Sequence, residues 1–182
     1  MEKPARPDKI HYYIGIAKAV SQRCTCYRSR GGAIIVRGDQ IIATGYIGAP
    51  RGTKDCLERG SCLREELKIP HGERYELCRS VHAEQNAIIN AARAGVSLFG
   101  GEMYIYGERP ATGELMDFIP CYFCKRMIIN AGINRVFSQM HDGSIKEFLI
   151  SEWVQDWQKN DIVDDKYKYG TDLNQKLGLT GK

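Results

Sequence analysis

Hydrophobic residues near the start of the chain follow two different periods. Between positions 8 and 22 they recur at helical spacing, at Ile10, Tyr13, Ile14, Ala17 and Val20. This spacing predicts an amphipathic helix, and Asp8 is suited to cap its first turn. The next segment, GGAIIVRGDQIIATGY at 31–46, holds two β-branched runs on either side of Arg37-Gly38-Asp39. That arrangement predicts a β-hairpin.

Two more strands and two more helices follow. The runs GEMYIYGE at 101–108 and NRVFS at 134–138 predict strands. One helix is expected from a cap at Ser80 to Gly95, and another from Pro120 to Gly132. Because strands and helices alternate, we expect an α/β fold.

Two parts of the chain carry weaker patterns. Residues 47–77 are rich in glycine, proline, cysteine and charge and show little periodicity, so a long loop is expected there. After the last predicted strand, the sequence predicts one helix over 144–157. A polar, poorly ordered tail, GTDLNQKLGLTGK at 170–182, is expected to follow it.

Length and composition are those of one globular domain. The 182 residues are 43% hydrophobic, which is enough for a substantial core. We expect a single domain over 1–182, with the motif-bearing core at about 8–140 and a C-terminal helix and tail at about 141–182. The first twenty residues lack the apolar core of a secretion signal, and no run is long enough to span a membrane. We therefore expect a cytoplasmic protein without a membrane partner.

The charge is modestly positive, at +4 from 26 Lys and Arg against 22 Asp and Glu. Without a clustered basic patch, a charge of this size disfavours an electrostatic nucleic-acid binder. Anionic small molecules are compatible with it.

The sequence contains seven cysteines, and these need an explanation other than disulfide bonds, because a reducing cytosol does not favour structural disulfides. They fall in pairs and clusters, at Cys24, Cys26, Cys56, Cys62, Cys78, Cys121 and Cys124. Metal binding is the leading explanation, and plain buried thiols are the alternative for some of them.

Metal-ligand chemistry stands at the start of both helices that follow the hairpin. The first opens with HAE, His82 to Glu84, and the second with PCYFC, Pro120 to Cys124. Two cysteines three residues apart at a helix start can direct both sulfurs to one point, and an imidazole from a neighbouring helix adds a third ligand. Zinc takes such ligands at roughly 2.0 to 2.3 Å and prefers four, so one position is left for water.

Glu84 suits a role beside this water. Two residues along a helix correspond to about 200° of rotation, which does not favour joint coordination of one metal by His82 and Glu84. Zinc lowers the pKa of a bound water to about 7, and a neighbouring base is needed to carry its proton. Glu84 is therefore predicted to be the catalytic proton carrier.

Each motif has an ordinary explanation when it is taken alone. His82 could be a cap or a packed side chain, and Cys121 with Cys124 could be a redox pair or half of a structural zinc site. Together, with a glutamate two residues after the histidine and a proline before the first cysteine, they match the zinc-deaminase pattern H-x-E followed by P-C-x-x-C.

At these residues the sequence resembles the cytidine and deoxycytidylate deaminase superfamily, most closely its deoxycytidylate (dCMP) deaminase branch. Three segments within about 10–137 carry the resemblance: GGAIIVRGDQIIATGYIGAPRG, LCRSVHAEQNAIINAARAGVSLFGGEMYI and PCYFCKRMIINAGINRV. The resemblance implies a cytidine-deaminase-like three-layer α/β/α fold with a mixed β-sheet flanked by helices. It also implies that His82, Cys121 and Cys124 hold a catalytic zinc and that Glu84 shuttles protons.

The same resemblance implies a second, structural zinc. We favour Cys26, Cys56, Cys62 and Cys78 as its ligands, with Cys24 and His71 as the other candidates. A metal would tie the long 47–77 loop to two other segments and replace the core that the loop lacks. Buried thiols are the alternative for Cys62 and Cys78.

Three features depart from the family pattern. Ile47 stands in GYIG, where the family usually has an asparagine that contacts the sugar, so the choice of nucleotide is open. The segment GERPATGELMDFIPC, which includes Phe118, is longer than the usual link and is expected to line the pocket. Phe137 and His141 occupy the region where the family commonly has a tyrosine that stacks on the pyrimidine.

The leading hypothesis is a zinc-dependent hydrolase that converts dCMP to dUMP and ammonia, with backbone N–H groups near Ala83 steadying the tetrahedral centre. Arg51, in the GAPRG loop, is predicted to bind the nucleotide phosphate, or else it is a solvated loop arginine. Family members are commonly oligomers, so a homo-oligomer is expected.

Two classes of alternative stay open. One is deamination of another substrate: cytidine, deoxycytidine, dCTP, or a base in single-stranded nucleic acid, which would require a basic and aromatic groove. The other is a non-enzymatic zinc-binding module. Glu84 argues against it, because a purely structural site needs no proton carrier.

Overall fold

The computed structural model describes residues 6–70 and 73–159, so the predicted tail at 170–182 lies outside the described residues. Its elements are, in chain order, α1 (Lys9–Ser21), β1 (Arg30–Arg37), β2 (Gln40–Tyr46), α2 (Cys56–Arg59), α3 (Leu63–Glu66), the 3-10 turn η1 (Tyr75–Leu77), α4 (Ala83–Arg93), β3 (Glu102–Glu108), α5 (Tyr122–Asn130), β4 (Arg135–Gln139), β5 (Ile145–Leu149) and α6 (Ile150–Lys159).

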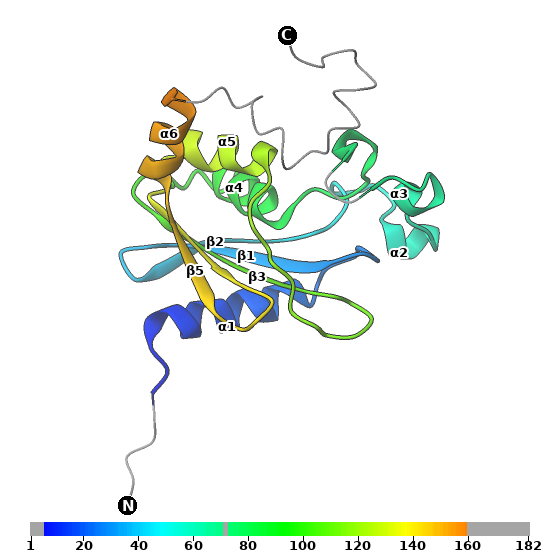
Figure 1. The fold of residues 1–182 in the computed structure, drawn as a ribbon, viewed down its shortest axis with the longest axis horizontal. Helices are drawn as coiled ribbons and strands as arrows, with labels where there is room; N and C mark the ends of the chain where they lie inside the picture. Colours follow the sequence, from blue (N-terminus) through cyan, green and yellow to red (C-terminus); the bar gives the residue numbers. More distant parts are fainter. Residues whose placement is uncertain (1–5, 71–72, 160–182) are drawn as a thin grey trace, which may run out of the picture.

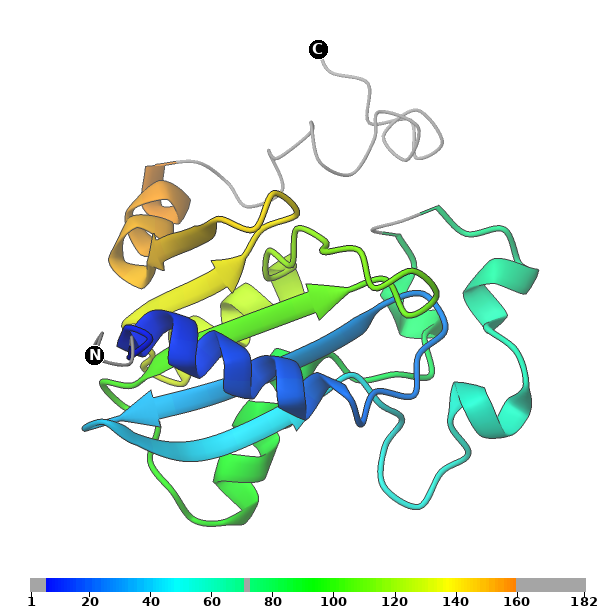
Figure 2. The same cartoon turned by 90° about the horizontal axis from the view of Figure 1, so that it is seen from below.

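The strands form one mixed five-stranded sheet in the order β2-β1-β3-β4-β5. β3 and β4 are parallel and are joined through α5, whereas the other neighbouring strands are antiparallel. Helix α1 covers one face of the sheet, and α4 and α5 lie side by side on the other (Figures 1 and 2). Buried residues form one cluster on each face. The predicted three-layer α/β/α fold with a mixed sheet is confirmed.

Two glycines let helices approach the sheet closely. A Cβ atom on Gly32 of β1 would lie 2.2 Å from the carbonyl oxygen of Ala17 in α1. A Cβ atom on Gly45 of β2 would lie 2.2 Å from the amide nitrogen of Ala87 in α4. Contacts this short are impossible for a real side chain, so glycine sets the distance between each helix and the sheet.

Most element predictions from the sequence are confirmed. The Asp8 side chain caps α1 by accepting from the amide of His11 at 3.0 Å. The hairpin turns at Gly38 and Asp39, and β3 and β4 lie where they were predicted. Gly95 follows α4 with φ +67°, and the amide of Val96 donates to the carbonyl of Ala91, as in a Schellman ending.

The start of α4 and the start of α5 both differ from the prediction. His82, not Ser80, is the N-cap residue of α4, and the amide of His82 donates to Oε1 of Gln85 at 3.1 Å. The helix predicted to begin at Pro120 begins at Tyr122 instead, with Cys121 as its N-cap residue. Each helix thus begins at a predicted metal ligand.

Two regions hold elements that the sequence prediction lacked. The predicted helix over 144–157 is wrong in its first half: 145–149 form β5, which pairs with β4 and extends the sheet, and α6 begins only at Ile150. The predicted 47–77 loop contains α2, α3 and η1. Among the described residues, no helix is long and apolar enough to cross a membrane.

Gly45→Ala should destabilise the protein by about 1–3 kcal/mol, because the added methyl group pushes α4 away from β2. Gly15→Ala is the matched control. Gly15 is exposed in α1, and a methyl group added there would meet nothing within 4 Å, so alanine should stabilise the helix by up to about 1 kcal/mol. Denaturant unfolding measures both changes, and equal stability of the two variants would contradict this packing account.

Candidate active site

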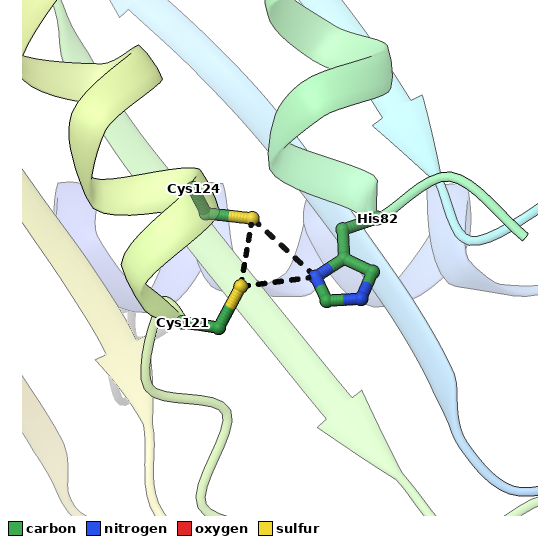
Figure 3. A group of neighbouring side chains, drawn as sticks. All are labelled: His82, Cys121 and Cys124. Atoms are coloured by element: carbon green, nitrogen blue, oxygen red, sulfur yellow. Dashed lines mark hydrogen bonds between the residues drawn. The ribbon is translucent and has the colours of Figure 1, made fainter. Parts of the chain in front are cut away.

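Three donor side chains meet where the N-termini of α4 and α5 lie together (Figure 3). His82 is the N-cap residue of α4, Cys121 is the N-cap residue of α5, and Cys124 follows in the first turn of α5. Cys124 is fully buried, whereas His82 and Cys121 are partly exposed. The site is therefore anchored on two helices and opens on one side.

The spacing of the three donor atoms suits zinc. Nδ1 of His82 lies 3.5 Å from Sγ of Cys121 and 3.4 Å from Sγ of Cys124, and the two sulfurs are 3.6 Å apart. Donors bound at about 2.0 to 2.3 Å around a tetrahedral zinc lie about 3.5 to 3.8 Å from one another. Two thiols and one imidazole at these distances form three corners of such a site.

The two thiols differ in their acidity. A hydrogen bond from Cys124, opposed by burial and reinforced by His82, lowers the pKa of Cys121 to about 4. The pKa of Cys124 lies well above the ordinary thiol value, first because of its bond to Cys121 and then because of burial. The N-terminus of α5 also favours negative charge at Cys121. One thiolate is thus ready for a metal before any metal binds.

Glu84 lies in the first turn of α4 and is buried, with 3% of its surface exposed. Burial raises the pKa of its carboxyl group above the ordinary glutamate value, and the neighbouring His82 opposes this rise. Glu84 lines the same cavity as His82 and Cys121. A carboxyl group that holds its proton more tightly than usual is suited to proton transfer near neutral pH.

A cavity of about 610 Å³ opens beside these residues. Ile47, buried at 5% exposure, and Phe118 form an apolar part of its wall. The Phe118 ring lies over the sheet, because a Cβ atom added to Gly31 or to Gly107 would meet it. Arg109 and residues 115–119 also line the cavity, as predicted for the long segment that leads to Cys121.

The two aromatic candidates in and after β4, Phe137 and His141, lie in different parts of the structure. His141 lines the cavity, and its Nδ1 lies 2.8 Å from Oδ1 of Asp117, another lining residue. Phe137 is buried in the core on the α1 side, where its ring stacks on Tyr104 at 4.9 Å. Phe137 therefore does not reach the pocket.

The cysteines of the predicted second zinc site also line this cavity, at Cys26, Cys56, Cys62 and Cys78. Among the described residues, the His82, Cys121 and Cys124 donors are the one group of three that lies within 4.8 Å, so no three of these four sulfurs lie that close together. Burial raises the pKa of Cys56, and the neighbouring Cys26 raises it further. The amide of Arg28 donates to Sγ of Cys26 at 3.4 Å. His71 lies outside the described residues.

Arg51 is exposed and donates a hydrogen bond to Oδ1 of Asn90 in α4. It is not among the described residues that line the cavity, whereas Arg28, Arg64, Arg79 and Arg109 are. Sequence patterns carried no signal for Arg64 or for its neighbour Tyr75, because both belong to the loop without periodicity.

The fold and the donor set are those of an α/β protein with a candidate zinc site. The family model described as the cytidine and deoxycytidylate deaminase zinc-binding region matches residues 7–140. The chain belongs to this family.

Several relatives carry the name deoxycytidylate deaminase. The protein of Mycobacterium phage D29 is 36% identical over 137 residues, a match that covers 72% of this chain and 94% of the phage protein. The protein of Schizosaccharomyces pombe is 34% identical over 131 residues, covering 72% of this chain and 37% of the yeast protein. The match to the Saccharomyces cerevisiae protein is 32% identical and covers 80% of this chain and 42% of that protein. The chain thus spans less than half the length of these two yeast relatives.

Solved structures agree with the family assignment. The dCMP deaminase of cyanophage S-TIM5 in its apo form matches with a TM-score of 0.53 and 27% identity, covering 75% of this chain and 86% of that chain. The same phage enzyme in complex with dCMP and dUMP matches with a TM-score of 0.53 and 29% identity, covering 74% and 82%.

In the metal-free protein, iodoacetamide should alkylate Cys121 much faster than Cys124. The pKa of Cys121 is about 4, so its rate should be flat with pH above about pH 5, whereas Cys124 is buried and protonated. Zinc should protect Cys121. Peptide mass spectrometry measures both rates, and equal labelling of the two cysteines would show that their environments do not differ as described.

Proposed function

We propose that the protein is a zinc-dependent hydrolase that deaminates a free cytosine nucleotide, converting dCMP and water to dUMP and ammonia. One observation carries this proposal: the donors of His82, Cys121 and Cys124 meet at 3.4 to 3.6 Å with the buried carboxyl group of Glu84 beside them. The S-TIM5 enzyme, a structural neighbour, was solved with dCMP and dUMP, which supports the choice of substrate.

His82, Cys121 and Cys124 would hold the catalytic zinc. A bound zinc ion would act as a Lewis acid and would lower the pKa of a water molecule to about 7. Glu84 accepts a proton from the attacking water and passes it to N3 of the cytosine ring. It then takes the remaining proton of that water, now the hydroxyl at C4, and delivers it to the amino group, which leaves as ammonia while the C4 carbonyl forms. The amide at Ala83 lies at the N-terminus of α4, where it can donate to the oxygen carried by the tetrahedral carbon.

Other residues of the cavity can contact the base, the sugar and the phosphate of the substrate. Ile47 and Phe118 provide apolar surface for the flat base and the carbon face of the sugar. Arg109 and His141, both exposed, stand on the same cavity and can meet an anionic group. A cavity of about 610 Å³ is of the size that encloses a mononucleotide.

Ammonia release from a panel of substrates tests the proposed function. The full chain, loaded with zinc, is given dCMP, dCTP, deoxycytidine, cytidine or single-stranded DNA. We expect the highest kcat/KM for dCMP. A preference for single-stranded DNA would identify a nucleic-acid deaminase, and no activity on any substrate in a zinc-loaded protein would leave a non-enzymatic module.

Glu84→Gln should abolish turnover while zinc content is unchanged. Glutamine keeps the shape of the side chain but cannot carry a proton, and loss of general acid–base catalysis costs at least about 10²- to 10⁴-fold in rate. Steady-state kinetics with elemental analysis check this. A variant with near-wild-type activity would remove Glu84 from its role.

We further propose a second zinc bound by Cys26, Cys56, Cys62 and Cys78. The four thiols line the cavity, and Arg28, Arg64 and Arg79 line it with them and can offset the negative charge of bound thiolates. The Oγ atom of Ser80 is buried without a partner among the described residues and lies near Cys56, as expected of a donor to a thiolate. Closing this site requires the sulfurs to move together on metal binding.

The purified chain should therefore contain two zinc ions, and Cys62→Ser should lose one of them. Its thermal stability should fall more than its rate per folded molecule, because the lost metal clips the loop and not the reaction centre. Cys24→Ser is the matched control. Sγ of Cys24 donates to the carbonyl of Ser29 at 3.2 Å, and Cys24 is not among the described residues that line the cavity, so this variant should keep both ions. One zinc per wild-type chain would rule out the second site.

The phosphate partner is proposed from the lining of the cavity. Arg109→Ala should lower kcat/KM for dCMP by about 10- to 100-fold, since phosphate binding energy positions the base, and deoxycytidine should be nearly unaffected. Arg51, the partner predicted from sequence, is not among the described residues that line the cavity, so Arg51→Ala should have the smaller effect. A loss for dCMP confined to Arg51→Ala would place the phosphate at the GAPRG loop instead.

Homo-oligomerisation and a cytoplasmic location stay predictions from the sequence.

A further inference from the structure

The imidazole of His82 is held on one side by an aromatic ring from the long loop. The Tyr75 ring meets the His82 ring edge-on, with centroids 4.9 Å apart and planes at 83°. Within the described part of the chain, the hydrogen-bond partners of this imidazole, Cys121 and Cys124, both lie at Nδ1. Tyr75 therefore contacts the same ring that presents Nδ1 to the two thiols.

Tyr75 is in turn fixed by Arg64 of α3. The guanidinium carbon of Arg64 lies 4.8 Å from the centroid of the Tyr75 ring, which is a cation–π contact. Nη2 of Arg64 donates to the carbonyl oxygens of Pro70 at 3.0 Å and Glu73 at 2.6 Å. This one side chain thus joins two points of the loop and supports the ring that touches His82.

The environment of Arg64 is unusual for a cation. Arg64 is 6% exposed, and no carboxylate of the described residues lies within ion-pair distance of it. Its Nε is buried without a hydrogen-bond partner in the described part of the chain. Burying an arginine without a carboxylate is costly, so a side chain placed in this way indicates a role beyond solubility or ordinary packing.

Neither residue belongs to the hydrophobic core. Tyr75 and Arg64 line the cavity with His82 and Glu84, and both are absent from the two clusters of described residues that hold the helices to the sheet. Changes at these two positions should therefore leave the sheet and its helices in place. Substitutions at Tyr75 and Arg64 can therefore report on the metal site without a change in the whole fold.

We propose that Tyr75 and Arg64 are positioning residues that orient His82 for metal binding, so that α3 and η1, which carry them, act on the catalytic site. The inference rests on the proposed zinc centre at His82, Cys121 and Cys124. Side chains that orient a metal-bound histidine typically contribute about 10- to 100-fold in metal affinity. The loop is thereby part of the metal site, although it supplies no ligand to it.

The test compares four variants of the full chain. Tyr75→Leu removes the ring edge and Tyr75→Phe keeps it. Arg64→Met removes the cation and both hydrogen bonds at similar volume, and Arg59→Met removes an exposed arginine of α2 in the same loop as a matched control. Zinc affinity at the catalytic site is read in zinc buffers from the protection of Cys121 against iodoacetamide. The visible spectrum of the cobalt-substituted protein reports the ligand geometry.

Tyr75→Leu should weaken zinc binding about 10- to 100-fold and change the cobalt bands, and Arg64→Met should weaken it about tenfold. Tyr75→Phe and Arg59→Met should bind as wild type does. Unchanged affinity and spectrum in a folded Tyr75→Leu protein would overturn the inference, and so would equal losses in Tyr75→Leu and Tyr75→Phe. The titration of the wild-type protein tests the proposed zinc centre separately from the variants. If zinc never protects Cys121 in the wild-type protein, the zinc centre itself is refuted.

Discussion

The close contact between α4 and the sheet is the constraint on which the candidate site depends. Gly45 lets the backbone of α4 lie against β2, and the side-chain amides of Asn86 and Asn90 donate to the carbonyls of Tyr46 and Thr44 at 2.8 and 2.6 Å. These contacts fix the position of the N-terminus of α4. The parallel pair β3 and β4 requires a crossover, and that crossover is α5, so a second helix start lies beside the first. Any ligand set carried by the two helix starts is then assembled by the fold itself.

The loop between β2 and α4 is stabilised in a different way. It adds little to either hydrophobic cluster, and its described contacts are mainly polar: the capping box at Asp55 and Glu58, the carbonyl bonds of Arg64, and the bond from Arg79 to the carbonyl of Ser61. Such contacts individually contribute about 0.5–1.5 kcal/mol or somewhat more when charged. Two features can constrain the loop further: its cysteines Cys56, Cys62 and Cys78, which line the cavity together with Cys26, and the packing of Tyr75 on His82.

Sequence patterns carried the local features well. The period of apolar residues located α1, the hairpin and β3, and residue chemistry at two helix starts was enough to predict that His82, Cys121 and Cys124 meet.

What the patterns missed depends on tertiary contacts. Residues 145–149 are amphipathic enough to suit a helix, but pairing with β4 makes them a strand. Ser80 has the chemistry of a cap, yet the chain enters α4 two residues later. Tyr75 and Arg64 meet His82 only through folding of the loop, and Arg51 is held by Asn90, a contact across 39 positions that no local pattern encodes.

The most direct test of the proposed zinc centre is anomalous diffraction at the zinc edge from crystals of the zinc-loaded chain. We predict a zinc peak within bonding distance of Nδ1 of His82 and Sγ of Cys121 and Cys124, with the fourth position left to solvent and Glu84 beside it. A peak that Glu84 ligates directly, or no peak between the starts of α4 and α5, would contradict this centre.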